Sequence, residues 1–108
     1  MNETLNELYN VIINRRDEPM EGSYTCYLLN EGLNKILKKC GEECSEVIIA
    51  AKDGDVDEIK SEVCDLVFHL LVLLVDREIK LNEIEEILQR RSEKIGNLKT
   101  FYKSDHSS

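Results

Sequence analysis

Residues 42–65 read EECSEVIIAAKDGDVDEIKSEVCD, and the predicted fold depends on the turn at the centre of this stretch. Its centre, Asp53-Gly54-Asp55, is typical of a turn, and Asp55 is a good N-cap for a helix that follows. Apolar residues recur at helical spacing on both sides of the turn. We therefore expect a hairpin of two antiparallel helices, one from about Thr25 or Asn30 to Lys52 and one from Val56 to Arg77.

Each predicted helix carries two carboxylates three residues apart, which places both on one face of the helix. The pairs are Glu43 with Glu46 and Glu62 with Asp65, at similar distances from the turn. They therefore lie at about the same height in the hairpin. Like charges this close repel unless a cation neutralises them, and hard oxygen ligands suit Mg²⁺ or Mn²⁺. The spacing predicts a divalent-cation site for phosphate chemistry.

A solvated acidic face is the ordinary interpretation of acidic residues on a helix, and we adopt it for Glu83, Glu85 and Glu86. Glu43 and Glu62 differ from these residues because they border the apolar stripes of their helices. An unpaired carboxylate in such a position is costly to desolvate. This border position and the matched height of the pairs favour the metal site over a solvated face.

The chain has 108 residues and a formal net charge of −8, which fits one small domain. The negative charge argues against a nucleic-acid partner, because phosphate backbones are held mainly by Lys and Arg. Because residues 1–10 do not resemble a signal peptide, we expect a cytoplasmic protein. Four cysteines lack zinc-ligand spacing and are interpreted as reduced, small apolar residues: Cys26, Cys40, Cys44 and Cys64.

The remainder of the chain is also predicted to be helical, with no strand alternation. A first helix runs from about Asn2 to Arg16, and a last helix runs from Leu81 to about Asn97. A break at Gly32 would divide the second helix, so we expect four or five helices in total. We assign residues 1–99 to one all-α domain and residues 100–108 to a polar C-terminal tail.

From Leu66 to Val75 every residue except His69 is apolar, and the run is shorter than the about 20 residues that span a membrane. A helix segment that is apolar all round must be buried all round, which one small bundle can hardly achieve. We therefore expect a subunit interface there, in a homodimer or a higher homo-oligomer. His69 is interpreted as a hydrogen-bonded core residue that could also bond to Asp65. The predicted core face of this helix comprises Ile59, Val63, Leu66, Leu70 and Leu73.

Basic and hydroxyl residues near the acidic motif allow two interpretations each. Ser23, Tyr24 and Thr25 stand at a loop-to-helix junction, either as N-caps or as phosphate ligands at a helix N-terminus. Arg90 and Arg91 are either solvated or phosphate contacts, as are three lysines one to two turns before the acidic motif. These lysines are Lys35, Lys38 and Lys39.

Several segments together resemble a known superfamily. The pattern E-E-x-x-E followed by E-x-x-D is similar to that of the all-α nucleoside-triphosphate pyrophosphohydrolases, which include the MazG and dimeric dUTPase groups. Within them, the chain most resembles phosphoribosyl-ATP pyrophosphohydrolase of histidine biosynthesis. Residues 22–28, GSYTCYL, resemble that family's G-S-Y-T-x-x-L segment, and residues 32–43, GLNKILKKCGEE, resemble its G-x-x-K-I-x-K-K-x-G-E-E segment.

The resemblance implies a four- to five-helix MazG-like bundle whose helices are shared across an oligomer interface. It implies hydrolysis of 1-(5-phosphoribosyl)-ATP to 1-(5-phosphoribosyl)-AMP and pyrophosphate, with this nucleotide as the small-molecule partner. Glu43, Glu46, Glu62 and Asp65 would be the ligands of Mg²⁺, or of Mn²⁺. Glu42 and Glu43 would be the catalytic residues, with Glu42 as a supporting acid or as a residue that orients water. Two alternatives are a housecleaning pyrophosphohydrolase that acts on non-standard nucleotides and a non-enzymatic helical interaction module.

Overall fold

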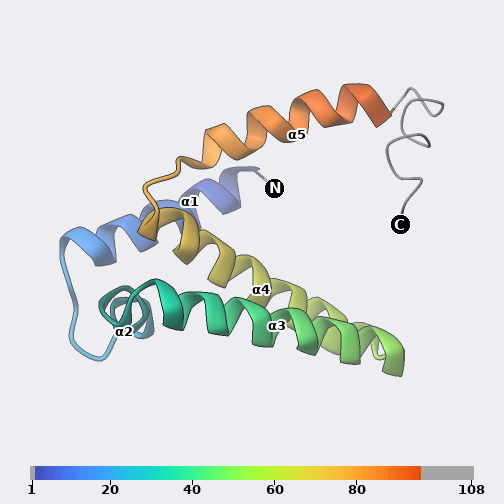
Figure 1. Ribbon diagram of the computed structural model, residues 1–108, viewed down its shortest axis with the longest axis horizontal. Coiled ribbons are helices and arrows are strands. Elements are labelled where there is room, and N and C mark those ends of the chain that lie inside the picture. The colour runs from blue at the N-terminus through green and yellow to red at the C-terminus, as the bar shows by residue number, and fades with distance from the viewer. Residues whose placement is uncertain (1, 96–108) are drawn as a thin grey trace.

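The computed structural model describes residues 2–95, which form five α-helices and contain no strand (Figure 1). The all-α prediction is therefore confirmed. The predicted tail at residues 100–108, and the predicted end of the last helix at Asn97, lie outside the described residues. The helices are α1 (Asn2–Asp17), α2 (Tyr24–Glu31), α3 (Leu33–Asp53), α4 (Val56–Asp76) and α5 (Leu81–Ile95).

Two glycines place the ends of α3 where the sequence suggests them. Gly32 has a φ of 90° and its N–H donates to the Leu28 carbonyl, so it separates α2 from α3 as expected. Gly54 has a φ of 74°, in the left-handed region, and ends α3 with a turn that reverses the chain. Asp55 then caps α4, because its carboxylate accepts a hydrogen bond of 3.1 Å from the Glu58 N–H.

The hairpin of α3 and α4 is the longest part of the molecule, and α1 and α2 pack at the end away from Gly54 (Figure 1). The Tyr9 hydroxyl of α1 donates a hydrogen bond of 2.7 Å to the Ile79 carbonyl, which ties α1 to the connection between α4 and α5. The core therefore lies at this end of the hairpin. Its fully buried side chains come from all four of these helices: Ile12, Leu28, Ile36, Val72 and Val75.

The prediction of which face of α4 lies in the core was partly wrong. Val63 and Leu70 are 40% and 42% exposed, whereas His69 and Leu71, on either side of Leu70, are buried. Periodicity could not choose a face, because this part of α4 is apolar on every side. The buried positions are His69, Leu71, Val72 and Val75. None of the helices within residues 2–95 is long and apolar enough to cross a membrane.

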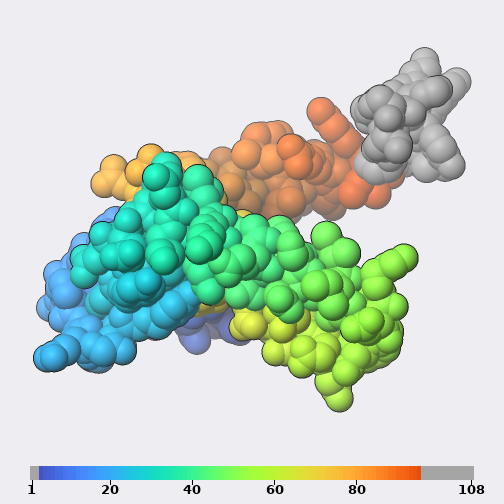
Figure 2. All heavy atoms as spheres, turned by 60° about the horizontal axis from the view of Figure 1, so that its bottom comes forward, coloured from blue at the N-terminus to red at the C-terminus, as the bar shows by residue number. Residues whose placement is uncertain are grey.

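Helix α5 runs away from the other four helices instead of closing the bundle (Figures 1 and 2). Leu81 is buried at its start, but Leu88 and Ile95 are 57% and 64% exposed. The radius of gyration is 16.3 Å, against about 13 Å for a compact domain of 100 residues. A single chain thus leaves the apolar face of α5 largely uncovered.

Substitution of two glycines by alanine tests this backbone geometry, with opposite expected signs. Gly54→Ala forces a left-handed residue to carry a Cβ and should lower the free energy of unfolding by about 1 kcal/mol. Gly41→Ala lies inside α3, where an added Cβ meets nothing within 4 Å, and should raise it by about 0.5–1 kcal/mol. Urea unfolding followed by circular dichroism measures both. Equal destabilisation by the two changes would contradict the assigned conformations.

Candidate active site

Three of the four predicted metal ligands come together across the hairpin. Glu43 of α3 and Glu62 and Asp65 of α4 each offer a carboxylate oxygen, and these oxygens all lie within 4.8 Å of one another. Glu43 and Glu62 are half-buried and Asp65 is exposed. The Gly54 turn produces this arrangement, because it sets the register in which α3 faces α4. The matched heights inferred from the sequence are therefore confirmed for these three residues, which we call the carboxylate cluster.

The carboxylate cluster carries unbalanced negative charge. Burial, followed by the charges of Asp65 and Glu43, raises the pKa of Glu62 above its usual value. Among residues 2–95, no lysine or arginine forms an ion pair with any of the three carboxylates. A divalent cation would supply the missing charge.

The donor set also fits the size of such a cation. Oxygens on opposite sides of a Mg²⁺ ion lie about 4.2 Å apart, given Mg–O distances of about 2.1 Å. The oxygens of the carboxylate cluster lie within 4.8 Å of one another, which is close to this distance, so small side-chain rotations would bring all three onto one ion. Carboxylate oxygens are also the ligand type that suits Mg²⁺ and Mn²⁺.

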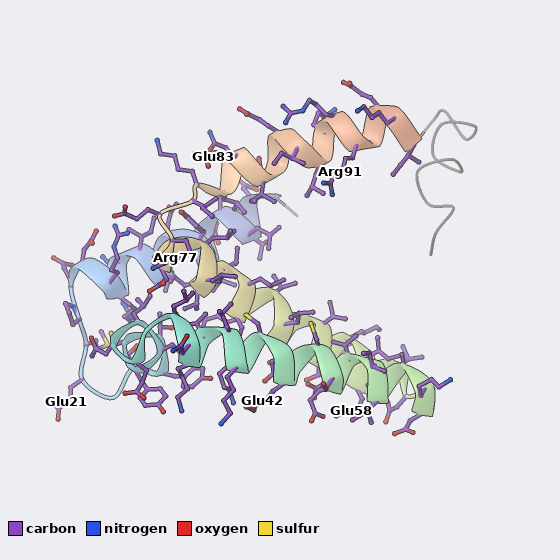
Figure 3. All side chains as sticks on the ribbon, viewed as in Figure 1. Glu21, Glu42, Glu58, Arg77, Glu83 and Arg91 are labelled. Atoms are coloured by element: carbon purple, nitrogen blue, oxygen red, sulfur yellow. The ribbon has the colours of Figure 1, made fainter. Side chains whose placement is uncertain are left out.

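Glu46 and Glu42 lie outside the carboxylate cluster. Glu46 is exposed one turn beyond Glu43 on α3, and its charge contributes to the raised pKa of Glu62. Glu42 is exposed and forms an ion pair of 3.6 Å with Lys39. It projects from the edge of the hairpin that faces away from α5 (Figure 3). Glu46 is thus close enough to act on the carboxylate cluster, whereas Glu42 belongs to a neighbouring surface.

That neighbouring surface is a hollow of about 280 Å³, which we call the lysine hollow. The three predicted substrate lysines all line it, so the structure brings them together as a group. Its position on the N-terminal half of α3 places it one to two helical turns before Glu43. The lining residues are Tyr24, Tyr27, Lys35, Lys38, Lys39 and Glu42.

Ser23 and Thr25 do not line the lysine hollow. The Ser23 hydroxyl accepts a hydrogen bond of 3.2 Å from the Cys26 N–H, so Ser23 is the N-cap of α2. Ser23 also lines a second, larger hollow of about 500 Å³, which is formed by the loop between α1 and α2. Thr25 is half-buried in the first turn of α2. The N-cap interpretation of Ser23 is therefore confirmed, and a contact of either residue with substrate stays a prediction.

Two tyrosines border both hollows. The sequence suggested Tyr24 only as a hydroxyl at the loop-to-helix junction, and sequence reasoning missed Tyr27. Tyr24 and Tyr27 lie one turn apart on α2, with ring centroids 6.1 Å apart and planes inclined by 24°. His69 is buried in the core, as predicted, and its Nε2 lies 2.9 Å from the Tyr24 hydroxyl. Its Nδ1 bonds to the backbone carbonyl of Asp65, at 2.7 Å, and not to the carboxylate. The G-S-Y-T segment contained Tyr24, but nothing in it indicated a histidine 45 residues away.

The remaining candidates lie elsewhere. Arg91 lies on α5, well separated from Glu42 (Figure 3), and both Arg90 and Arg91 are exposed. All four cysteines are free, as predicted; Cys26 and Cys40 are buried, whereas Cys44 and Cys64 are exposed instead of packed.

Comparison with known proteins gives consistent matches over most of the chain. A family model described as phosphoribosyl-ATP pyrophosphohydrolase matches residues 5–92. A phosphoribosyl-ATP pyrophosphatase of Clostridium botulinum (strain Hall) is 54% identical over 98 residues, which cover 91% of this chain and 89% of the relative. A protein of the same name from Clostridium acetobutylicum is 55% identical over 98 residues, with the same coverage of both chains. The histidine biosynthesis bifunctional protein HisIE of Caldanaerobacter subterraneus is 54% identical over 92 residues, which cover 85% of this chain and 45% of that protein.

Glu62→Gln tests the charge repulsion within the carboxylate cluster. Because the pKa of Glu62 is raised in the folded state, its ionised form destabilises the metal-free fold as pH rises through that pKa. In EDTA at pH 8 the variant should therefore melt at a higher temperature than the wild type, and the difference should shrink as pH falls. Adding Mg²⁺ should raise the melting temperature of the wild type much more than that of the variant.

Glu86→Gln is the matched control, since it removes the same charge from an exposed position on α5. This control should change neither the metal-free melting temperature nor the response to Mg²⁺. A lower metal-free melting temperature for Glu62→Gln would mean that the carboxylates do not repel one another.

Proposed function

Because the chain belongs to the phosphoribosyl-ATP pyrophosphohydrolase family, we propose that it hydrolyses 1-(5-phosphoribosyl)-ATP to 1-(5-phosphoribosyl)-AMP and pyrophosphate, with a divalent cation at the carboxylate cluster. This reaction is a step of histidine biosynthesis. The single observation that carries the metal-site proposal is the convergence of Glu43, Glu62 and Asp65 without a basic partner within residues 2–95.

In this proposal the chain holds the triphosphate so that water can attack one phosphorus atom. Water attacks the α-phosphorus, the bond from that phosphorus to the bridging oxygen breaks, and pyrophosphate leaves. A bound Mg²⁺ or Mn²⁺ supplies neutralisation of phosphate charge and a lowered pKa for a bound water. The chain itself needs little covalent chemistry, since positioning and charge stabilisation dominate phosphoryl transfer.

The individual residues have distinct roles in this scheme. Glu43, Glu62 and Asp65 would hold the cation, and Glu46, one turn further along α3, would be the fourth ligand. Glu43 also orients the attacking water, with Glu42 as a supporting acid at the border of the lysine hollow. The lysine hollow attracts the anionic parts of the substrate, and this attraction offsets the net charge of −8 that would otherwise repel a nucleotide. Ser23 and Thr25 add hydroxyl contacts at the start of α2.

We also propose that the functional unit is a homodimer. Apolar side chains on α4 and on α5 remain between 39% and 64% exposed, and a large exposed apolar surface marks a protein interface. A second copy of the chain would cover them and would complete the bundle that α5 leaves open. The residues concerned are Val63, Leu70, Ile87, Leu88 and Ile95. The four free cysteines suit a reducing compartment, so we place the enzyme in the cytoplasm.

Substitution of each carboxylate tests the active-site proposal. Glu43→Gln, Glu62→Gln and Asp65→Asn should each lower kcat by at least about a hundredfold, because loss even of a residue that only supports a metal ligand costs about 10- to 100-fold. Helical content should stay unchanged. Glu46→Gln shows whether the fourth carboxylate belongs to the site, since a ligand should show the same loss. Glu58→Gln, an exposed acid on α4 outside the carboxylate cluster, is the control and should keep the wild-type rate.

The same assay separates the substrates. Pyrophosphate release is measured from phosphoribosyl-ATP, ATP and dUTP side by side, with Mg²⁺ and with EDTA. We expect rapid, EDTA-sensitive release from phosphoribosyl-ATP only. Faster release from ATP or dUTP would identify a housecleaning pyrophosphohydrolase, and no release from any of them would favour a helical interaction module.

Charged substitutions on the exposed apolar surface test the homodimer. Leu70→Glu and Leu88→Glu should shift the sedimenting species from dimer to monomer at micromolar concentration, because each places a carboxylate in an apolar interface. Leu71 is unsuitable for this purpose, because it is buried within the chain's own core. Met20→Glu, an exposed apolar position in the loop before α2, is the control and should stay dimeric. A wild-type protein that sediments as a monomer would rule out the homodimer.

A further inference from the structure

Tyr24 and Tyr27 form an aromatic wall between the lysine hollow and the loop hollow. Their rings stack at 6.1 Å, and Phe68 of α4 extends the stack behind Tyr24 at 6.2 Å. Both tyrosines are nearly half exposed, although aromatic rings of this size normally contribute to a core. The wall therefore offers flat aromatic surface to both hollows, close to the residues proposed to hold the cation.

The position of Tyr24 in the wall is set by His69. The Asp65 backbone carbonyl can only accept a hydrogen bond, so Nδ1 of His69 carries the proton that it shares with this carbonyl. Nε2 of the neutral ring is then an acceptor, and the Tyr24 hydroxyl donates to it at 2.9 Å. The His69 ring also meets Tyr24 edge-on, with centroids 5.7 Å apart. Since Asp65 belongs to the carboxylate cluster, these bonds fix the wall relative to the proposed cation site.

A positively charged side chain already lies over Tyr27 in the aromatic wall. The Lys35 ammonium lies over the face of Tyr27, 5.8 Å from the ring centroid, which is cation–π geometry. Lys35 also belongs to the lysine hollow. The face of Tyr27 is therefore a place where this chain stabilises a cation beside an anion-binding surface.

The proposed substrate combines the two features that this surface suits. Its adenine carries the phosphoribosyl group on N1, and alkylation at N1 leaves a delocalised positive charge on the purine at neutral pH. The adenine of ATP is uncharged. A flat cation stacks on a phenol ring more strongly than a neutral base does, in the same way that aromatic side chains recognise quaternary ammonium ligands.

We propose that Tyr24 and Tyr27 bind the cationic N1-substituted adenine of the substrate, which takes the place of the Lys35 ammonium on Tyr27, and that His69 is the positioning residue for Tyr24. The displaced Lys35 turns to the substrate's phosphates with Lys38 and Lys39. This inference rests on the proposed function and names the part of the site that distinguishes phosphoribosyl-ATP from ATP. Discrimination arises because ATP offers the wall no charge.

A binding experiment without turnover tests the wall. The probes are 1-methyl-AMP, whose purine is cationic, and AMP, whose purine is neutral, and their affinities are measured by calorimetry without metal. The wild type should bind 1-methyl-AMP about tenfold more tightly than AMP, the size expected of a partly desolvated cation–π contact. Tyr27→Leu keeps an apolar side chain and should abolish the preference, whereas Tyr27→Phe keeps the aromatic face and should retain most of it. Equal affinities in the wild type, or an unchanged preference in Tyr27→Leu, would overturn the proposal.

Kinetics with phosphoribosyl-ATP and Mg²⁺ separate this inference from the proposed function. Tyr27→Leu should raise KM for phosphoribosyl-ATP about tenfold, more than it lowers kcat, and it should raise KM for any slow hydrolysis of ATP by a smaller factor. Rapid wild-type turnover without a preference for 1-methyl-AMP over AMP would support the proposed function and contradict the role proposed for the aromatic wall. A Tyr27-dependent preference without turnover would retain the cationic-purine site and reject the proposed reaction.

The role of His69 needs a variant that leaves the buried position filled. Tyr24→Phe removes only the hydroxyl that donates to His69, and the ring stays in the stack. It should reduce the preference for 1-methyl-AMP several-fold and lower the melting temperature modestly, because Nε2 of the buried His69 loses its hydrogen-bond partner. His69→Gln, which can still accept from Tyr24, should retain more of the preference than His69→Leu. A full preference in Tyr24→Phe would show that His69 does not position the wall.

Discussion

Repulsion among Glu43, Glu62 and Asp65 is the constraint on which the site depends. The turn at Gly54 brings these carboxylates within 4.8 Å of one another, and no basic side chain within residues 2–95 pairs with them. The free energy that holds them there comes from the core at the other end of the hairpin, where Ile36 and Val72 are fully buried. The fold thus maintains an unfavourable charge arrangement at a distance from the contacts that stabilise it, as expected of a site prepared for a cation.

Because the lysines and the carboxylates are separated along α3, one helix carries both a basic surface and an acidic surface. The lysine hollow occupies the first half of α3, and Glu43 lies just beyond it. The ion pair between Lys39 and Glu42, at 3.6 Å, marks the boundary between the basic and the acidic surface. If these lysines lay nearer the carboxylate cluster, they would neutralise it and weaken a metal site. The aromatic wall of α2 adjoins the basic surface, so the elements proposed to bind cation, phosphate and purine follow one another along the molecule.

The exposure of apolar residues on α4 and α5 and the open shape of the chain have one structural cause. A hairpin of two long helices offers more apolar face than the short helices α1 and α2 can cover, and α5 leaves the bundle instead of returning to it (Figure 1). Residues such as Leu70 and Leu88 are thus left exposed, where a further layer of helices could pack against them. In our proposal a second copy of the chain provides that layer.

Local rules are enough to predict the helices, the hairpin and the meeting of Glu43, Glu62 and Asp65 from the sequence, but not that Glu46 lies outside the carboxylate cluster. Helical periodicity, the Gly54 turn and a capping Asp55 act within a few residues, and matched spacing from the turn is enough to bring Glu43 to the height of Asp65. The buried face of α4 is known only from the tertiary structure, because a segment that is apolar on every side has no periodicity from which its buried face could be predicted. Only the tertiary structure, likewise, joined Tyr24 to His69 across 45 residues of chain, because a contact between side chains of different helices depends on how those helices pack.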